Sequence, residues 1–250
     1  MRNLLLSTGL AALLALPAGA TDVTDLSASE RDAFREEVRA YLLENPEVLM
    51  EAIAVLEERQ AAVEAEAQAL AVVENADALF NSAFDHVGGN PDGDVTIVEF
   101  LDYRCGFCRR AHPEVTELVE GDGNIRIITK EFPILGEQSV LASRFAIATR
   151  IALGGQAYEQ MNDALITMRA DVTELSLARL ADDLGLDSEA IFTAMDDPLV
   201  ETTINYNRQL GQRMGITGTP SFVFGDQLVQ GYVPLPNMLE IVDVLRTASQ

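Results

Sequence analysis

The sequence predicts an α/β domain with a helical insertion, preceded by an N-terminal helical arm, and three observations predict this fold class. An apolar strand over 95–101, a helix over 105–119 and a second apolar strand over 125–129 follow one another, an order that implies parallel pairing in a βαβ unit. The pattern from about 138 to 214 is helical throughout. The segment 21–84 is rich in Ala and Glu and contains no Gly, as is typical of long helices.

The first twenty residues have the pattern of a signal peptide. Arg2 precedes an apolar run from Leu4 to Leu16, which is too short for a bilayer span of about 20 residues. The small residues Ala18-Gly19-Ala20 follow, as at a cleavage site. We expect cleavage after Ala20 and a mature protein in the periplasm; an uncleaved anchor is the alternative. Since no later stretch is long and apolar enough to span a bilayer, we expect no membrane insertion.

The charge balance excludes one class of partner. The chain carries 40 Asp and Glu against 17 Lys and Arg, a formal net charge of −23. Because the phosphate backbone would repel such a chain, we expect no nucleic-acid partner. A well-solvated acidic surface is the simplest interpretation of the charge.

The arm, 21–84, is predicted to hold two helices separated at Asn45-Pro46. Ser29 with Asp32 is the expected capping pair of the first helix. The second helix has a heptad pattern of apolar side chains. The positions of this pattern are Leu49, Ile53, Leu56, Gln60, Val63, Ala67 and Leu70. We expect a homo-oligomer, a dimer or a trimer, through residues 30–75; packing of the stripe on the chain's own second domain is the alternative.

The second domain is expected over 85–250 and begins with a turn-rich linker at 85–94. Its helical insertion, about 138–214, has breaks that predict four or five helices. The breaks are Gly154-Gly155, the region of Asp171, Gly185 to Asp187, and Pro198. A hairpin of two short strands around Gly225-Asp226 and a last helix over 236–247 complete the domain.

The two cysteines are the most informative residues. Cys105 and Cys108 are the only ones in the chain, and they enclose Gly106 and Phe107 at the start of a helix. Because so small a ring removes little entropy from the unfolded chain, a structural disulfide is a poor explanation, and a reactive pair or a metal pair remains. A thiolate at a helix N-terminus is stabilised by free amides and the helix dipole. We expect Cys105 to be the exposed sulfur, tuned by Arg104.

Strand, CGFC and the helix beginning CRRAHPEV resemble the DsbA-like thiol–disulfide oxidoreductases of the thioredoxin fold. Pro113 and Glu99 stand where this family carries a helix proline and a buried carboxylate, and Thr219-Pro220 resembles its cis-proline loop. The resemblance implies that Cys105 and Cys108 are catalytic and that Glu99 assists proton transfer at the second cysteine. The sequence Tyr41 to Leu49 resembles the N-terminal region of the Scs copper-sensitivity suppressor and Com1-like proteins, which implies oligomerisation.

The residues themselves support these roles and leave alternatives. A carboxylate such as Glu99 in an apolar strand is costly to bury unless it is used or paired, and an ion pair with Lys130 is the alternative. A cis proline at Pro220 leaves the backbone of Thr219 free to pair with an extended substrate; an ordinary loop proline is the alternative. We expect Thr219, Pro220, Gly106 and Phe107 to contact substrate, and we interpret His112 as a surface or packing residue.

These observations favour an exported enzyme that forms, reduces or isomerises disulfides in other proteins through Cys105 and Cys108. Its expected partners are cysteine-containing exported proteins and a membrane redox partner. No cofactor is needed, because two sulfurs carry both electrons. The alternative is a periplasmic Cu(I)-binding, copper-tolerance protein that uses the same two thiolates. Apart from that alternative we expect no metal site.

Overall fold

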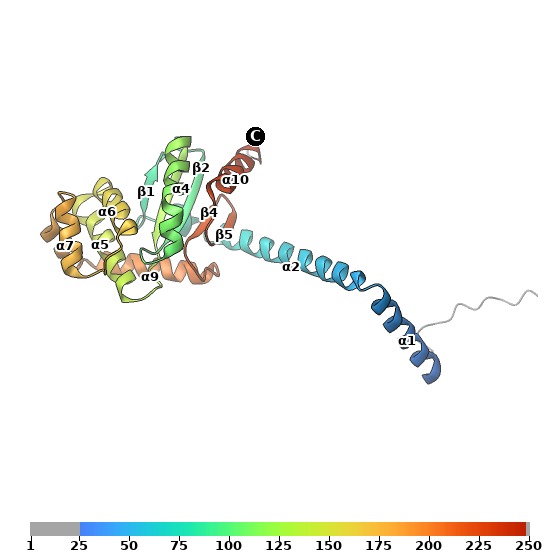
Figure 1. The fold of residues 1–250 in the computed structure, drawn as a ribbon. Helices are drawn as coiled ribbons and strands as arrows, with labels where there is room; N and C mark the ends of the chain where they lie inside the picture. Colours follow the sequence, from blue (N-terminus) through green and yellow to red (C-terminus); the bar gives the residue numbers. More distant parts are fainter. Residues whose placement is uncertain (1–25, 249–250) are drawn as a thin grey trace, which may run out of the picture. The chain divides into compact units, whose positions relative to one another are not determined.

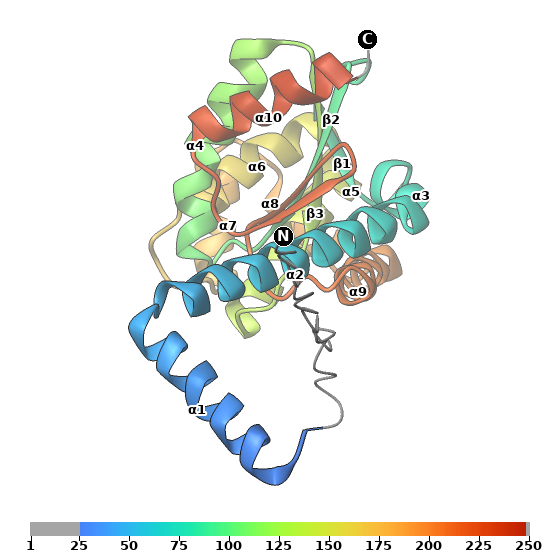
Figure 2. The same cartoon turned by 90° about the vertical axis from the view of Figure 1, so that its right-hand side faces the viewer.

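The computed structural model describes residues 26–248, so the expected signal peptide over 1–20 lies outside the described residues. The chain divides after Gln60 into two compact units. Figures 1 and 2 give two views of the ribbon, with the described part coloured by sequence. The expected α/β fold of thioredoxin type, with its helical insertion and its N-terminal helices, is confirmed.

The N-terminal helices are α1 (Ala28–Glu44) and α2 (Glu47–Glu74). Ser27 caps α1: its hydroxyl accepts from the backbone N–H of Glu30, and the Glu30 carboxylate accepts from the N–H of Ser27. The expected capping pair, Ser29 with Asp32, is therefore wrong by two positions, since the residue with extended backbone and a partner three residues later is Ser27.

The end of α2 belongs to the second unit, where it packs with the short helix α3 (Ala76–Phe80). Val72 and Leu79 are buried in the same apolar cluster as Phe100 of the sheet. Lys130, itself fully buried, donates to the carbonyl of Ala78. The root of the arm is thus part of the core of the second unit.

The sheet of the second unit has five strands in the order β1-β3-β2-β4-β5. The strands are β1 (His86–Gly89), β2 (Val95–Leu101), β3 (Ile125–Glu131), β4 (Ser221–Phe224) and β5 (Gln227–Gln230). β2 and β3 are parallel, as predicted, and β4 and β5 form the predicted hairpin. The expected linker at 85–94 instead contains β1, which pairs antiparallel with β3.

Helices cover both faces of the sheet. α4 (Gly106–Asp122) and α10 (Leu235–Ala248) share an apolar cluster with the odd-numbered side chains Val95 and Ile97 of β2. The even-numbered Val98 and Phe100 pack with α3 and α9 (Pro198–Arg213) on the other face. This alternation decides which side chains of β2 and β3 can meet each other.

The helical insertion between β3 and β4 consists of five helices, and the predicted breaks fall between them. The helices are α5 (Glu137–Leu153), α6 (Gly155–Thr167), α7 (Glu174–Asp183), α8 (Ser188–Ala194) and α9 (Pro198–Arg213). α5 is their centre, with eight buried side chains and contacts to α6, α8 and α9. Their apolar cluster reaches Leu101, Cys105 and Cys108, so the insertion supports the cysteine pair from one side.

Candidate active site

The cysteine pair lies where β2 ends and α4 begins. Cys105 is the N-cap of α4, with extended backbone (φ −77°, ψ 119°), and Gly106 is the first helical residue. The first amides of a helix have no partner within the helix, and here they face the Cys105 sulfur. Cys108 is one turn along, on the buried face of α4 with Ala111 and Val115.

Cys105 is not the exposed sulfur that the sequence predicted. It is only 6% exposed, and Cys108 is completely buried. The reason is the loop before β4: the Cys105 thiol donates to the carbonyl of Thr219, with 3.1 Å between Sγ and O. The peptide bond between Thr219 and Pro220 is cis, as the resemblance implies. The loop therefore lies directly over the sulfur that must react.

The two thiols have opposite acidities. The pKa of Cys105 falls to about 5, chiefly because the Cys108 thiol hydrogen-bonds to it, with further help from the backbone amides of Phe107 and Cys108, against the effect of burial. The pKa of Cys108 is raised, first by burial, then by the same hydrogen bond and by the charge of Glu99. At neutral pH this gives one nucleophilic thiolate beside one protonated thiol.

The three arginines near the motif bind other parts of the second unit. Arg104 donates to the carbonyl of Ala170, and Arg109 donates to the carbonyls of Ile166 and Met168. Arg110 stacks over the ring of Tyr232. The largest causes that lower the Cys105 pKa are hydrogen bonds from Cys108 and the backbone, and none of the three arginines is among them.

Glu99 lies in the middle of β2 on the face that α4 covers, and it is 5% exposed. Burial, and then the charge of Glu131, raise its pKa to about 7. The alternative, an ion pair with Lys130, is wrong, because Lys130 points to the other face of the sheet. There its ammonium donates to Asp85 at 2.5 Å. Glu99 is thus a buried carboxyl without a cationic partner, and it is electrostatically coupled to Cys108.

Sequence reasoning missed a second buried carboxyl, Glu131, at the end of β3. Its Oε1 accepts hydrogen bonds from the hydroxyls of Tyr103 and Tyr158, both at 2.7 Å, and Asn162 donates to Tyr103. Burial raises the pKa of Glu131 to about 7, against these hydrogen bonds. The signal was present: Lys130 and Glu131 are charged residues at the end of an apolar strand, as Glu99 is within one.

The surface around the cysteines is apolar and open. Phe107 is 61% exposed, and nothing lies near the position that a Cβ on Gly106 would occupy. Ile134 and Leu135 are also exposed, and their backbone amides both donate to one oxygen of Asp102, which lies three residues before Cys105. The predicted substrate-contacting residues therefore lie together at the start of α4 and the cis-proline loop.

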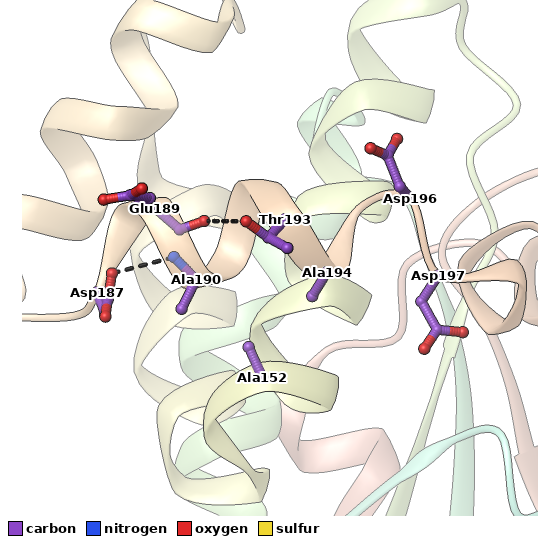
Figure 3. Close-up of a pocket in the computed structure, with 8 residues that line it drawn as sticks. All are labelled: Ala152, Asp187, Glu189, Ala190, Thr193, Ala194, Asp196 and Asp197. Atoms are coloured by element: carbon purple, nitrogen blue, oxygen red, sulfur yellow. Dashed lines mark hydrogen bonds between the residues drawn. The ribbon is translucent and has the colours of Figure 1, made fainter.

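A separate hollow of about 750 Å³ lies beside α8 and is lined by four carboxylates. Figure 3 shows these carboxylates spread along α8 and the turn after it, without converging on one point. Asp187 caps α8 by accepting from Ala190, and Asp197 caps α9 by accepting from Leu199. Capping explains two of the four acids, and the Thr193 hydroxyl in the lining donates to the carbonyl of Glu189.

Residues 26–248 contain neither a metal-binding cluster nor a membrane-crossing helix. No group of three or more His, Cys, Asp or Glu side chains in this range is arranged to hold a metal ion. Within the same range, no helix combines the length and the apolar character that a membrane crossing requires.

Comparison with protein families gives two matches. A model described as DSBA-like thioredoxin domain matches residues 96–243. A model described as the copper resistance protein ScsC N-terminal domain matches residues 30–62. The first match covers more than half of the chain and includes the cysteine pair, Glu99 and the cis-proline loop.

Several solved structures that are similar to the chain are described as thioredoxin-like proteins or as ScsC. A thioredoxin-like oxidoreductase from Silicibacter pomeroyi is 43% identical, with 68% of this chain and 97% of that one covered and a TM-score of 0.65. Proteus mirabilis ScsC in a transitional conformation is 27% identical, with coverage of 91% and 100% and a TM-score of 0.65. A periplasmic thioredoxin-like protein from Salmonella enterica is 28% identical, with coverage of 68% and 94% and a TM-score of 0.59.

The curated relatives are longer proteins that share one module with the chain. A Na⁺/H⁺ antiporter from Salinispora tropica is 28% identical over 138 residues, which are 55% of this chain and 21% of the antiporter. The chain thus spans about a fifth of the length of this relative.

Proposed function

The chain belongs to the family of DSBA-like thioredoxin domains, and from this premise we propose that it exchanges disulfides with exported proteins through Cys105 and Cys108. It is a thiol–disulfide oxidoreductase of the DsbA and ScsC type. The single observation that carries the proposal is the asymmetry of the pair. A thiolate at Cys105 with a pKa of about 5 lies beside a buried, protonated Cys108.

In the proposed reaction, the Cys105 thiolate attacks one sulfur of a substrate disulfide and forms a mixed disulfide, while the other substrate sulfur leaves as a thiolate. Cys108 then loses its proton to Glu99 and attacks Cys105, which releases the second substrate thiolate and leaves the Cys105–Cys108 disulfide. The reverse sequence transfers the disulfide to a substrate dithiol. Glu99 can take part because its pKa of about 7 lies near working pH.

We infer that the pair is oxidising. A low pKa at Cys105 stabilises the reduced form as a thiolate, and this stabilisation raises the reduction potential. The side chain of Phe107 supplies no hydrogen bond or charge of the kind a histidine would add. We therefore expect a potential between the values of roughly −180 mV for protein disulfide isomerase and roughly −120 mV for DsbA.

The test is the reduction potential of the pair in glutathione buffers at neutral pH. A value in the expected range supports a protein that donates or rearranges disulfides. A value below about −250 mV, near that of thioredoxin, would contradict this direction and indicate a reductant. Cys105→Ser serves as the control, because a single remaining thiol cannot form the internal disulfide.

The surroundings of the site support a protein substrate. Phe107, Ile134 and Leu135 offer an exposed apolar surface, and the backbone of Thr219 next to the cis Pro220 is available to an extended chain once it displaces the Cys105 thiol. We propose the periplasm as the location and a membrane redox partner as the source or acceptor of electrons. The likeness to a periplasmic thioredoxin-like protein supports the location.

We propose that the arm makes the protein a homo-oligomer, a dimer or a trimer, through residues 30–75. Heptad side chains of α2 support this, since Leu49, Ile53 and Leu56 are between 46% and 54% exposed. The match of residues 30–62 to an ScsC N-terminal domain adds support. Two or three active sites in one particle would favour rearrangement of wrong disulfides, because neighbouring sites raise the effective concentration of one another.

Cu(I) binding by the same thiols is a second candidate. Two observations favour it: both cysteines are free and hydrogen-bonded to each other, and the arm matches a domain described for a copper resistance protein. Two thiolates suit Cu(I). The raised pKa of Cys108 opposes it, because binding must displace that proton. Titration of the reduced protein with Cu(I) against a chromophoric chelator tests this candidate, and competition no stronger than that of the Cys105→Ser variant would remove it.

A further inference from the structure

A cavity of about 360 Å³ lies beneath α4 and is lined by residues of this helix, of α6 and of the strands β1, β2 and β3. Glu99 forms part of its wall, although only 5% of this residue is exposed. The cavity has room for several water molecules, and its polar lining offers them partners. The buried carboxyl beside Cys108 therefore has an open space on one side.

Two histidine–carboxylate pairs line the same cavity. His112 Nε2 lies 3.0 Å from Asp163 Oδ1, and His86 Nε2 lies 3.0 Å from Glu159 Oε1. Exposure rises along each pair. The His112 and Asp163 side chains are 20% and 68% exposed, and those of His86 and Glu159 are 10% and 54% exposed. A graded series thus runs from the buried Glu99 through imidazoles to carboxylates in solvent.

We propose that this cavity is the route by which protons pass between Cys108, Glu99 and solvent, with His112 and Asp163 at its mouth. The inference rests on the proposed role of Glu99 and extends it. In the resolving step the Cys108 proton moves to the Glu99 carboxylate. It then moves through water in the cavity to the His112 imidazole and out to solvent. In the reverse step a proton follows the same route inward and ends on the leaving Cys108 thiolate.

The position of His112 favours it as the mouth. It follows Cys108 by four residues, so both side chains lie on the same side of α4. Its partner Asp163 is the most exposed of the four paired groups. His86 is held neutral, because burial lowers its pKa against the effect of Glu159. His86 is also the more buried of the two imidazoles, so His112 is the one closer to solvent.

Other charged groups lie around this cavity and affect the pKa values of Glu99 and His86. Glu120 of α4 lines the cavity, and Glu131 of β3 raises the pKa of Glu99. Arg150 of α5 lowers the pKa of His86. The charges of Glu120 and Glu131 attract protons to the route, while Arg150 lies on the side of the neutral His86.

The test is the rate at which the Cys108 thiol exchanges its hydrogen for deuterium, followed by the S–H stretching band in D2O. A Cys105→Ser background leaves Cys108 as the only thiol. Thr116 lines the cavity, so Thr116→Leu should fill it, while Thr116→Val keeps the size of the side chain. We expect Thr116→Leu to slow the exchange at least tenfold, Thr116→Val to leave it unchanged, and His112→Ala to slow it with restoration by added imidazole.

Amide exchange in the same spectra reports opening of the backbone as a whole, and it should be equal in all variants. The Glu99→Gln variant distinguishes the proposed role of Glu99 from the proposed route through the cavity. If Glu99→Gln slows the exchange but Thr116→Leu and His112→Ala do not, Glu99 relays protons and the cavity route is wrong. If Glu99→Gln has no effect, the proposed role of Glu99 fails, whereas the nucleophilic role of Cys105 is judged separately by its reduction potential.

Discussion

At the scale of single residues, the site depends on one hydrogen bond between two sulfurs. The same contact lowers the pKa of Cys105 and raises that of Cys108, because it stabilises the thiolate on Cys105 and holds the proton on Cys108. For Cys108 burial is the larger cause of the raised pKa, since this residue has no exposure at all. The contacts within the motif are therefore enough to assign Cys105 as the nucleophile.

Removal of that hydrogen bond should be visible in the titration of Cys105. We expect iodoacetamide to alkylate Cys105 in the reduced protein with a midpoint near pH 5. In Cys108→Ala the largest stabilising contact is lost, so the midpoint should rise by at least one unit. Cys108→Ser keeps a donor and is the matched control, with a midpoint closer to the parent. Equal midpoints in the two variants would contradict the assignment of this contact as the main cause.

At the scale of elements, the edge strand β1 depends on a glycine. Gly89 has φ +65°, and a Cβ there would lie 2.5 Å from the carbonyl oxygen of Ile125 and 2.8 Å from Val119. Side chains rarely adopt this backbone conformation, and the nearest atom is backbone that cannot rotate away. Because β1 also carries His86, this glycine helps to place one wall of the cavity under α4.

Gly89→Ala should therefore destabilise the protein. The left-handed backbone costs about 1–2 kcal/mol, and displacement of β3 adds to this. Gly121→Ala in α4 is the control, because nothing lies near its Cβ and alanine favours helices by about 1 kcal/mol. Chemical denaturation of both variants gives the comparison. A Gly89→Ala protein as stable as the Gly121→Ala protein would contradict the packing described here.

Elements with a periodic pattern or a clear break were predictable from sequence, and those that depend on distant contacts were not. The parallel pairing of β2 with β3 and the breaks at Gly154 and Pro198 follow from local residues. β1 was not predicted, because its four residues HVGG have little apolar pattern and become a strand only by pairing with β3. The contact that buries Cys105 comes from Thr219, which no local pattern connects to it.

The polar residues around the cavity beneath α4 were likewise only partly predictable from sequence. Glu99 was predictable as a charged residue in an apolar strand, and the cis peptide before Pro220 from the resemblance. His86, His112 and Glu131 come from three elements, and only the folded sheet and helices bring them toward Glu99. Sequence alone therefore indicates the reactive residues, and the structure is needed to find their proton path.

At the scale of the whole molecule, two buried carboxyls should make stability depend on pH. Burial raises the pKa values of Glu99 and Glu131 from 4.5 to about 7, so the native state holds more protons than the unfolded state between these values. The contribution of these groups to stability is fully present below pH 4.5 and is lost as pH rises through 7. Each carboxyl accounts for up to about 3 kcal/mol of this loss.

Urea denaturation of the oxidised protein between pH 4.5 and 8 tests this expectation, because oxidation removes the titration of Cys105. We expect the free energy of unfolding to fall over this interval. Glu99→Gln should reduce the fall, since glutamine keeps the size of the side chain and does not ionise. A rise of stability over the same interval would mean that the native carboxyls are ionised and paired.

The last prediction concerns the arm. The exposed heptad side chains Ile53 and Leu56 lie on one side of α2, whereas Val55 lies on the opposite side and is equally exposed, at 47%. If the heptad face joins the chains, Ile53→Glu places a charge in that seam and should yield monomers at micromolar concentration. Val55→Glu adds the same charge outside the seam and should leave the oligomer intact.

Light scattering of the full-length mature chain measures both masses. Reduction-potential measurements on the two variants should agree, because neither residue belongs to the compact unit that holds Cys105. A parent protein that is itself monomeric, or equal effects of the two substitutions, would contradict assembly through this face. Single chains would then carry out the disulfide exchange.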